Sequence, residues 1–138
     1  MSDLGLTHVA LSVSDSERSI DFYARFAGMT VVHRRKDDAT GRSVVWLSDL
    51  TRPFVIVLAE VEHVANELSG FAHLGIGCRD RAEVDRLAAL ARDEGRPCMG
   101  PVDSGYPVGY WAFIGDPDGH NLEISYGQEV GLTVASHR

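Results

Sequence analysis

Residues 110–126 of this 138-residue chain read YWAFIGDPDGHNLEISY. Two apolar, aromatic-rich runs flank a Pro-Asp-Gly turn, in which Pro fixes φ at the first turn position and Gly supplies the positive φ that follows. This pattern is typical of a β-hairpin. Because side chains alternate along a strand, Glu123 is expected on the face opposite Leu122 and Ile124. A carboxylate buried there without a partner would be costly, so Glu123 needs a cation or a hydrogen-bond network.

Two histidines occupy equivalent places in the two halves of the chain. His8 lies in the apolar run at 5–13 and His73 in the apolar run at 70–78, and an amphipathic helical run follows each. His73 follows His8 by 65 residues, and Asp80 at the second helix start follows Asp15 at the first by the same 65 residues. This constant register indicates an internal repeat.

The first half is predicted to contain a strand, a helix and three further strands. Ser14 or Asp15 caps the helix and Gly28 ends it. The three strands are expected at 29–35, 42–47 and 54–59. The helix is expected to bury an apolar stripe formed by Ile20, Tyr23, Ala24 and Ala27.

The second half repeats this order. A helix starts at Asp80 and ends near Gly95 and Pro97, and strands are expected at 97–102, 110–114 and 121–126. A Gly/Pro-rich loop at 103–109 precedes the hairpin, and loops of this kind often carry functional residues. The apolar stripe of this helix is formed by Val84, Leu87, Ala88 and Ala91.

Four motifs together resemble the vicinal oxygen chelate superfamily, which holds glyoxalase I, extradiol dioxygenases, fosfomycin-resistance proteins and bleomycin-binding proteins. They are GLTHVAL at 5–11, SIDFY at 19–23, FAHLGI at 71–76 and DPDGHNLE at 116–123. The resemblance covers residues 4–127. It implies an α+β fold in which two paired βαβββ modules form a half-open, barrel-like sheet around a central cavity. We expect one domain, with module one at about 4–60, a linker at 61–68, module two at 69–127 and a C-terminal tail at 128–138.

The resemblance also implies a metal site, because the family draws its ligands from the first and last strands of each module. His8, His73 and Glu123 occupy three of these positions. Aligning Asp49 with Asp116 places Ile56 at the fourth position, and a slip of one or two residues would give Val57 or Leu58. None of these side chains can bind a metal, and the nearest acid, Glu60, is expected to lie out of register.

A set of two imidazoles and one carboxylate leaves coordination positions open for two substrate oxygens. This predicts a small metal-dependent enzyme of the lyase, isomerase or dioxygenase type, in which a divalent ion chelates vicinal oxygens of a small substrate. The donor set does not choose among Fe, Mn, Zn, Ni and Co. Glu123 is also a candidate catalytic residue.

The sequence matches the residue patterns of the family's individual reactions less well than it matches the family's fold. An extradiol dioxygenase would have a Tyr where this chain has Phe113, and only Tyr106 or Tyr110 could replace that phenol as a catalytic residue. A phosphonate substrate would need a strongly cationic pocket, whereas the second half has no Lys and no Arg after Arg96 except the terminal Arg138. The alternative is a metal-free, bleomycin-resistance-like protein that stacks a planar molecule on Trp46, Trp111, Tyr110 and Phe113.

Composition excludes several other classes of function. The net charge of −7 argues against nucleic acid as a partner, and the one basic run, at 34–36, is interpreted as a solvated strand end. No apolar run is long enough to span a membrane, and the N-terminus lacks a signal peptide, so we expect a cytoplasmic protein. Cys78 and Cys98 are interpreted as buried apolar residues.

The first strand provides a reason to expect a homodimer. The run at 5–13 has no charged side chain to protect a sheet edge, so pairing with a second chain is expected. The family resemblance points the same way, because its cavity is often completed across two chains.

Overall fold

The structure is a computed structural model that describes residues 3–138 in two compact units. Unit 1 extends to Glu67 and unit 2 starts at Leu68. Met1 and Ser2, with which the N-terminal prediction begins, lie outside the described residues.

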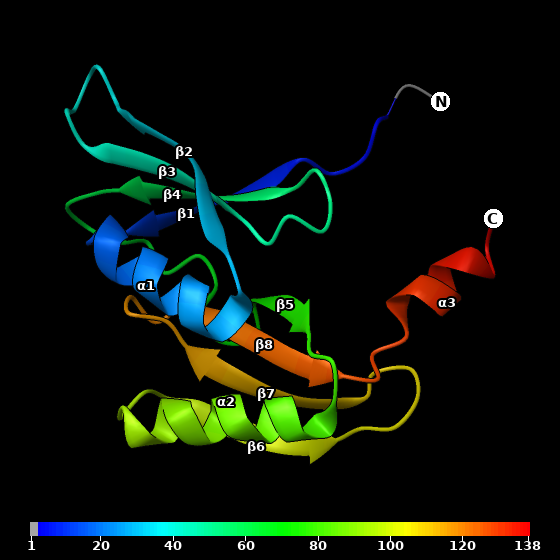
Figure 1. Cartoon of the computed structure of the whole chain (residues 1–138). Helices are drawn as coiled ribbons and strands as arrows, with labels where there is room; N and C mark the ends of the chain where they lie inside the picture. Colours follow the sequence, from blue (N-terminus) through cyan, green and yellow to red (C-terminus); the bar gives the residue numbers. More distant parts are fainter. Residues whose placement is uncertain (1–2) are drawn as a thin grey trace. The chain divides into compact units, whose positions relative to one another are not determined.

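Unit 1 has the order β1 (His8–Val13), α1 (Ser16–Ala27), β2 (Thr30–Lys36), β3 (Ser43–Ser48) and β4 (Val55–Glu60). Its sheet has the strand order β1-β4-β3-β2, in which β1 is parallel to β4 and the other pairs are antiparallel. Figure 1 shows α1 lying along one face of this sheet.

The core of unit 1 lies between α1 and that face. The strands bury Leu11, Val13, Val45, Leu47, Ile56 and Leu58. The predicted stripe of α1 is confirmed at Tyr23 and wrong at Ala24, which is exposed, while Ile20 and Ala27 are half-buried. Phe22 and Phe26 are buried as well, and their rings stack with a separation of 4.8 Å. Large aromatic side chains bury more apolar area than Ala, so they set the rotation of the helix.

Both ends of α1 have recognisable caps. Asp15, rather than Ser14, is the N-cap, and its Oδ1 accepts from the backbone N–H of Glu17 at 3.0 Å. Gly28 ends the helix in the left-handed conformation, with φ of 62°.

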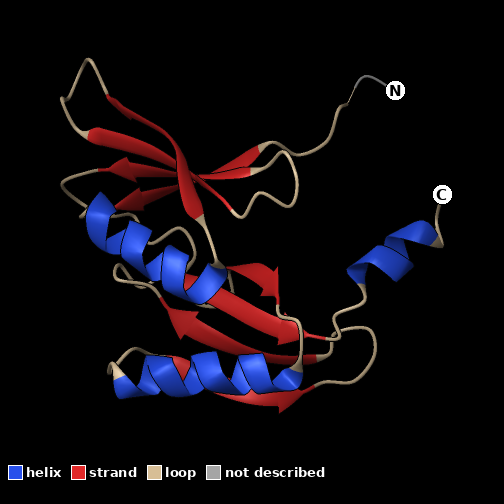
Figure 2. Cartoon of the chain, in the orientation of Figure 1, coloured by secondary structure: helices blue, strands red, loops and turns tan. Residues whose placement is uncertain are grey.

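Unit 2 repeats the topology. It has β5 (His73–Gly77), α2 (Arg81–Asp93), β6 (Cys98–Asp103), β7 (Tyr110–Gly115), β8 (Asn121–Tyr126) and α3 (Val130–Ala135). The strand order β5-β8-β7-β6 matches that of unit 1, again with a parallel first pair. Each unit has one four-stranded sheet, and Figure 2 shows α1 along the sheet of unit 1 and α2 along that of unit 2. The predicted α+β fold of two βαβββ modules is confirmed; both sheets are open.

The predicted stripe of α2 is also confirmed, since Val84, Leu87, Ala88 and Ala91 are all buried. Asp80 caps the helix by accepting from the backbone N–H of Glu83 at 2.8 Å. The tail at 128–138 contains a helix, α3, that the sequence analysis did not predict. None of the described helices is long and apolar enough to cross a membrane.

The hairpin that decides the fold forms as predicted. Asp116 Oδ1 accepts from the backbone N–H groups of Asp118 at 2.8 Å and His120 at 2.9 Å, and Gly119 has φ of 86°. The turn places Leu122 and Ile124 in the core under α2 and leaves Glu123 on the opposite face.

The outer edge of β1 is covered by a side chain from the segment that follows β4. The backbone N–H of Ser12 donates to Glu67 Oε1 at 2.6 Å, and its hydroxyl donates to Glu67 Oε2 at 2.8 Å. The expectation of an edge without charged protection is therefore wrong at this point, because the charge comes from outside the strand.

The two cysteines are half-buried rather than fully buried, and both are free thiols. Burial raises the pKa of Cys78 and of Cys98 above the ordinary value of 9.0. Both thiols are therefore mainly protonated at neutral pH.

Candidate metal centre

His73 and Glu123 face each other on the sheet of unit 2, on the side opposite α2. Their strands are parallel neighbours, and His73 pairs with Asn121 while Gly75 pairs with Glu123. His73 Nε2 lies 3.7 Å from Glu123 Oε2, and the two side chains are only 25% and 9% exposed. This arrangement is consistent with the sequence-based prediction that His73 and Glu123 lie close together.

The imidazole of His73 is held in one tautomer when it is neutral. Its Nδ1 lies 2.6 Å from the carbonyl oxygen of Phe71. A carbonyl oxygen can only accept a hydrogen bond, so Nδ1 carries the proton. Nε2 then presents its lone pair toward Glu123, which is the arrangement that second-shell contacts impose on metal-binding histidines.

The carboxylate of Glu123 accepts no hydrogen bond from residues 3–138, and within that range its one ion-pair contact is with His73. Gly75 makes room for it, since a Cβ at that position would lie 3.2 Å from Oε2. A nearly buried carboxylate facing a nitrogen lone pair is unfavourable unless a positive charge lies between them. The pair therefore fits a divalent cation with a preference for nitrogen and oxygen donors.

His8 occupies the matching position in unit 1. It is exposed, its Nδ1 lies 2.9 Å from Thr7 Oγ1, and it lines a cavity of about 530 Å³. His8 pairs with Val55, and Ala10 pairs with Val57 as Gly75 does with Glu123. Val57 is thus the equivalent of Glu123.

This register corrects the alignment that placed Ile56 at the fourth ligand position. Asp49 precedes Val57 by eight residues, whereas Asp116 precedes Glu123 by seven, so the connection before β4 is one residue longer. Ile56 itself is buried on the α1 side. Val57 cannot bind a metal, so unit 1 offers only His8 as a ligand at these two positions.

No group of three or more His, Cys, Asp or Glu side chains placed to hold a metal occurs among residues 3–138. The structure brings together His73 and Glu123, both in unit 2, while His8 belongs to unit 1. The set of three ligands remains a prediction.

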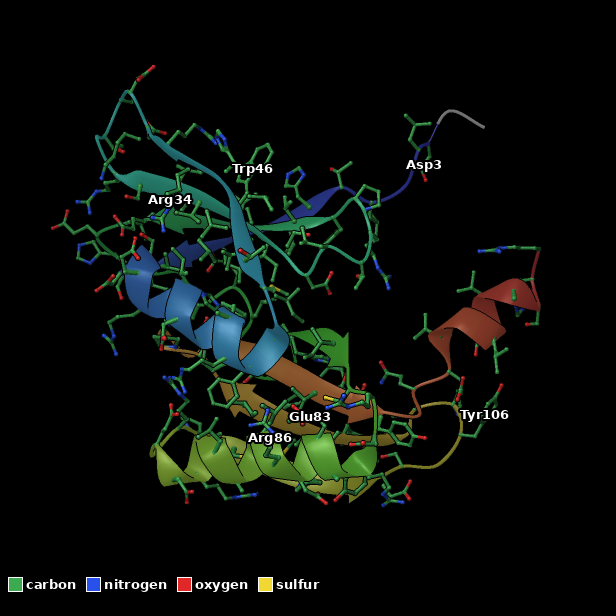
Figure 3. The ribbon with its side chains drawn as sticks, in the orientation of Figure 1. Asp3, Arg34, Trp46, Glu83, Arg86 and Tyr106 are labelled. Carbon is green, nitrogen blue, oxygen red and sulfur yellow. The ribbon has the colours of Figure 1, made fainter. Side chains whose placement is uncertain are left out.

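The two tyrosines proposed from the sequence are not brought to Glu123. Tyr110 lies on the α2 side of β7, where its hydroxyl donates to Asp85 Oδ1 at 2.5 Å and the Arg81 guanidinium lies 4.0 Å from its ring centre. The hydrogen bond to Asp85 raises the pKa of Tyr110 above 10.0. Tyr106 lies in the 104–109 loop, is 74% exposed and is labelled in Figure 3.

An aromatic row beside the His73–Glu123 pair was only partly predicted. Ring centres are separated by 5.4 Å between Phe71 and His73, 4.6 Å between His73 and Phe113, and 5.2 Å between Phe113 and Trp111. Phe71 and Phe113 also line a cavity of about 430 Å³ with Met99. Strand alternation could have placed Trp111 and Phe113 beside Glu123, but Phe71 precedes β5 and follows no periodic pattern.

Residues 5–124 match the Glyoxalase/Bleomycin resistance protein/Dioxygenase superfamily. The chain belongs to this superfamily. An uncharacterised superfamily relative from Pseudomonas aeruginosa is 39% identical over 129 residues, which cover 91% of each chain. A probable lactoylglutathione lyase of Vibrio cholerae is 30% identical over 129 residues, covering 90% of this chain and 91% of the relative.

A solved structure of the superfamily supports the same assignment. The glyoxalase I of Leishmania major superimposes with a TM-score of 0.73 at 25% identity, covering 98% of this chain and 95% of that one. The resemblance inferred from the sequence motifs is confirmed.

Proposed function

We propose that this protein is a small metal-dependent enzyme of the superfamily, of the lyase or isomerase type. His8, His73 and Glu123 would hold a divalent ion that chelates two neighbouring oxygens of a small substrate. The observation that carries this proposal is the His73 Nε2 lone pair facing a nearly buried carboxylate that has no hydrogen-bond donor within the described part of the chain. The similarity to a probable lactoylglutathione lyase supports the choice of lyase or isomerase over dioxygenase.

Each residue of unit 2 near the proposed metal would have a separate role. The Phe71 carbonyl fixes the tautomer of His73, so that the imidazole needs no reorganisation to act as a ligand. Phe113 and the aromatic row exclude water from one side of the pair and offer an apolar surface to the substrate. When bound, the metal supplies Lewis acidity that stabilises negative charge on a substrate oxygen.

Glu123 would also act as the general base, because a carboxylate carries two oxygens. Oε2 is the oxygen next to His73, which leaves Oε1 to accept a proton from the substrate. General-base help of this kind is typically worth roughly 10² to 10⁴ in rate.

Metal analysis of protein purified without chelators tests the proposal. We expect close to one equivalent of a transition metal after reconstitution, and a loss of affinity of about tenfold or more in Glu123→Gln, which keeps the side-chain size but removes the charge. Glu62→Gln is the matched control, because Glu62 is exposed and its partner is the exposed His63 at 4.0 Å. A metal-dependent thermal-shift screen of diols, 2-oxoaldehyde adducts and catechols would then define the substrate class.

Metal content below about a tenth of an equivalent, even after reconstitution, would rule out the enzyme. The aromatic row would then favour the second candidate, a metal-free protein that binds a planar small molecule.

A further inference from the structure

The basic run in β2 is exposed, and alternation divides it between the two faces of the sheet. Arg34 points toward α1, where its Nη1 lies 2.7 Å from Glu17 Oε1. Arg35 faces the other way and lines the cavity of unit 1 with His8 and Trp46. Arg34 and Trp46 are labelled in Figure 3. The interpretation of 34–36 as a solvated strand end is confirmed, since all three side chains are exposed, but Arg35 also lines the cavity.

A second guanidinium lines the same cavity from the connection between β3 and β4. Arg52 belongs to a segment with its own hydrogen bonds: its carbonyl accepts from the Phe54 N–H at 2.8 Å, and Asp49 Oδ1 accepts from the Thr51 hydroxyl at 2.6 Å. Burial alone would raise the pKa of Asp49, but the Thr51 hydrogen bonds and the Arg52 charge hold it below its ordinary value. Asp49 is therefore ionised, but it does not line the cavity.

The cavity has an excess of positive charge in a chain whose net charge is −7. No Asp or Glu is among its lining residues. Within residues 3–138, neither Arg35 nor Arg52 forms an ion pair. Cavities lined by one sign of charge attract small ligands of the opposite sign.

The rest of the cavity wall is suited to a flat apolar group. The indole of Trp46 is 37% exposed and contacts the ring of His33, with 4.8 Å between ring centres. Val32, Pro53 and Phe54 complete the apolar lining. A ligand would thus meet two cations and one aromatic face in the same cavity.

We propose that the cavity of unit 1 binds the oxyanion, carboxylate or phosphate, of a small molecule whose flat body packs on Trp46. Guanidinium groups bind such oxyanions through paired, charge-assisted hydrogen bonds. His8 lines the same cavity, so the oxyanion would lie near one proposed metal ligand; only this link rests on the proposed function. Anion binding itself needs no metal.

Calorimetric titration of the chelator-treated protein at low ionic strength tests the proposal, with benzoate and phenyl phosphate as probes and benzamide as the neutral control. Both anions are expected to bind saturably and more tightly than benzamide. Arg35→Gln and Arg52→Gln should each weaken binding by about tenfold, the scale of one lost charge-assisted contact. Arg34→Gln removes the same charge from the adjacent residue but faces α1, so its effect should stay below about twofold.

Three results would overturn the proposal: no saturable binding of either anion, equal binding of benzamide, or equal losses in all three variants. The stronger of the two anions identifies the preferred oxyanion. Repeating the titration with Glu123→Gln separates the two proposals, because Glu123 does not line this cavity and its loss should leave anion binding unchanged. If Glu123→Gln retains both anion binding and the full metal affinity, only the proposed enzyme is contradicted.

Discussion

Gly75 determines how closely the Glu123 carboxylate can approach β5. A methyl group at Gly75 would lie 3.2 Å from Glu123 Oε2, whereas one at Gly77, two residues further on the same strand and face, would meet nothing within 4 Å. Neither glycine has a positive φ, so both accept Ala without backbone strain. Substitution by Ala at Gly75 therefore has a matched control in the same substitution at Gly77.

We predict that Gly75→Ala weakens metal binding by about tenfold because it displaces the carboxylate, a loss typical of disturbed ligand positioning. Gly77→Ala should leave the affinity unchanged. Competition with a chelating dye measures both values. Equal affinities in the two variants would show that Glu123 is not a ligand.

The residues of the candidate site were predictable to different degrees. His73 and Glu123 could be found because the repeat and strand alternation fix their positions without knowledge of the loops. Val57 could not be identified as the equivalent of Glu123, because one extra residue precedes β4. Arg52 was not predicted to line a cavity, because it lies in the same irregular connection before β4. By contrast, strand alternation alone could have placed Arg35 and Arg34 on opposite faces of the sheet.

At the scale of elements, Glu60 links the end of β4 to the start of α1. Its Oε2 accepts from the Ser16 hydroxyl at 2.7 Å and from the Ser16 N–H at 2.8 Å. These hydrogen bonds from Ser16 hold the pKa of Glu60 below its ordinary value of 4.5. A lowered carboxylate pKa stabilises the folded state above the ordinary pKa, and this contribution is lost as pH falls through the lowered value.

We therefore predict that Glu60→Gln lowers the free energy of unfolding by about 1 kcal/mol at pH 7, the usual scale for hydrogen bonds of a partly exposed charged group. The difference from the unmodified protein should shrink below pH 4.5, where Glu60 becomes protonated. Urea unfolding between pH 3 and pH 7 measures it, with Glu62→Gln as control. A difference that grows toward acid pH would contradict the assigned direction.

The elements themselves were largely predictable because their signals are local. The hairpin follows from its turn residues, and the buried stripe of α2 from its spacing. In α1 the sequence offers two apolar arcs, and the choice between Ala24 and Phe26 depends on how well each fills the space against the sheet. Which arc is buried depends on tertiary packing against the sheet, so the spacing of apolar residues alone could not predict it.

At the scale of the whole molecule, each sheet ends in strands that have a neighbour on one side only. β1 and β2 are the edges in unit 1, where Glu67 occupies the β1 edge at Ser12, and β5 and β6 are the edges in unit 2. Unpaired edges favour association with another chain. The homodimer expected from the sequence stays a prediction on this basis.

Mixing inactive His8→Ala and His73→Ala chains tests both the dimer and the origin of the ligands. If each site takes His8 from one chain and His73 with Glu123 from the other, up to about half of the sites in the mixed dimers should regain metal, because one of their two sites is intact. Sites built within one chain would regain none. A monomer in light scattering at micromolar concentration would contradict the dimer directly.

The Glu67 contact with Ser12 has a consequence for solubility. Ser12 presents its N–H on the free side of β1, and a carboxylate bonded there blocks the ladder that a misfolded strand would need to extend. Glu67 thus acts as a gatekeeper against fibrillar aggregation. Glu67→Ala should shorten the lag before light scattering rises on gentle heating, whereas Glu62→Ala, a neighbouring exposed acid, should not; equal lag times would remove this role from Glu67.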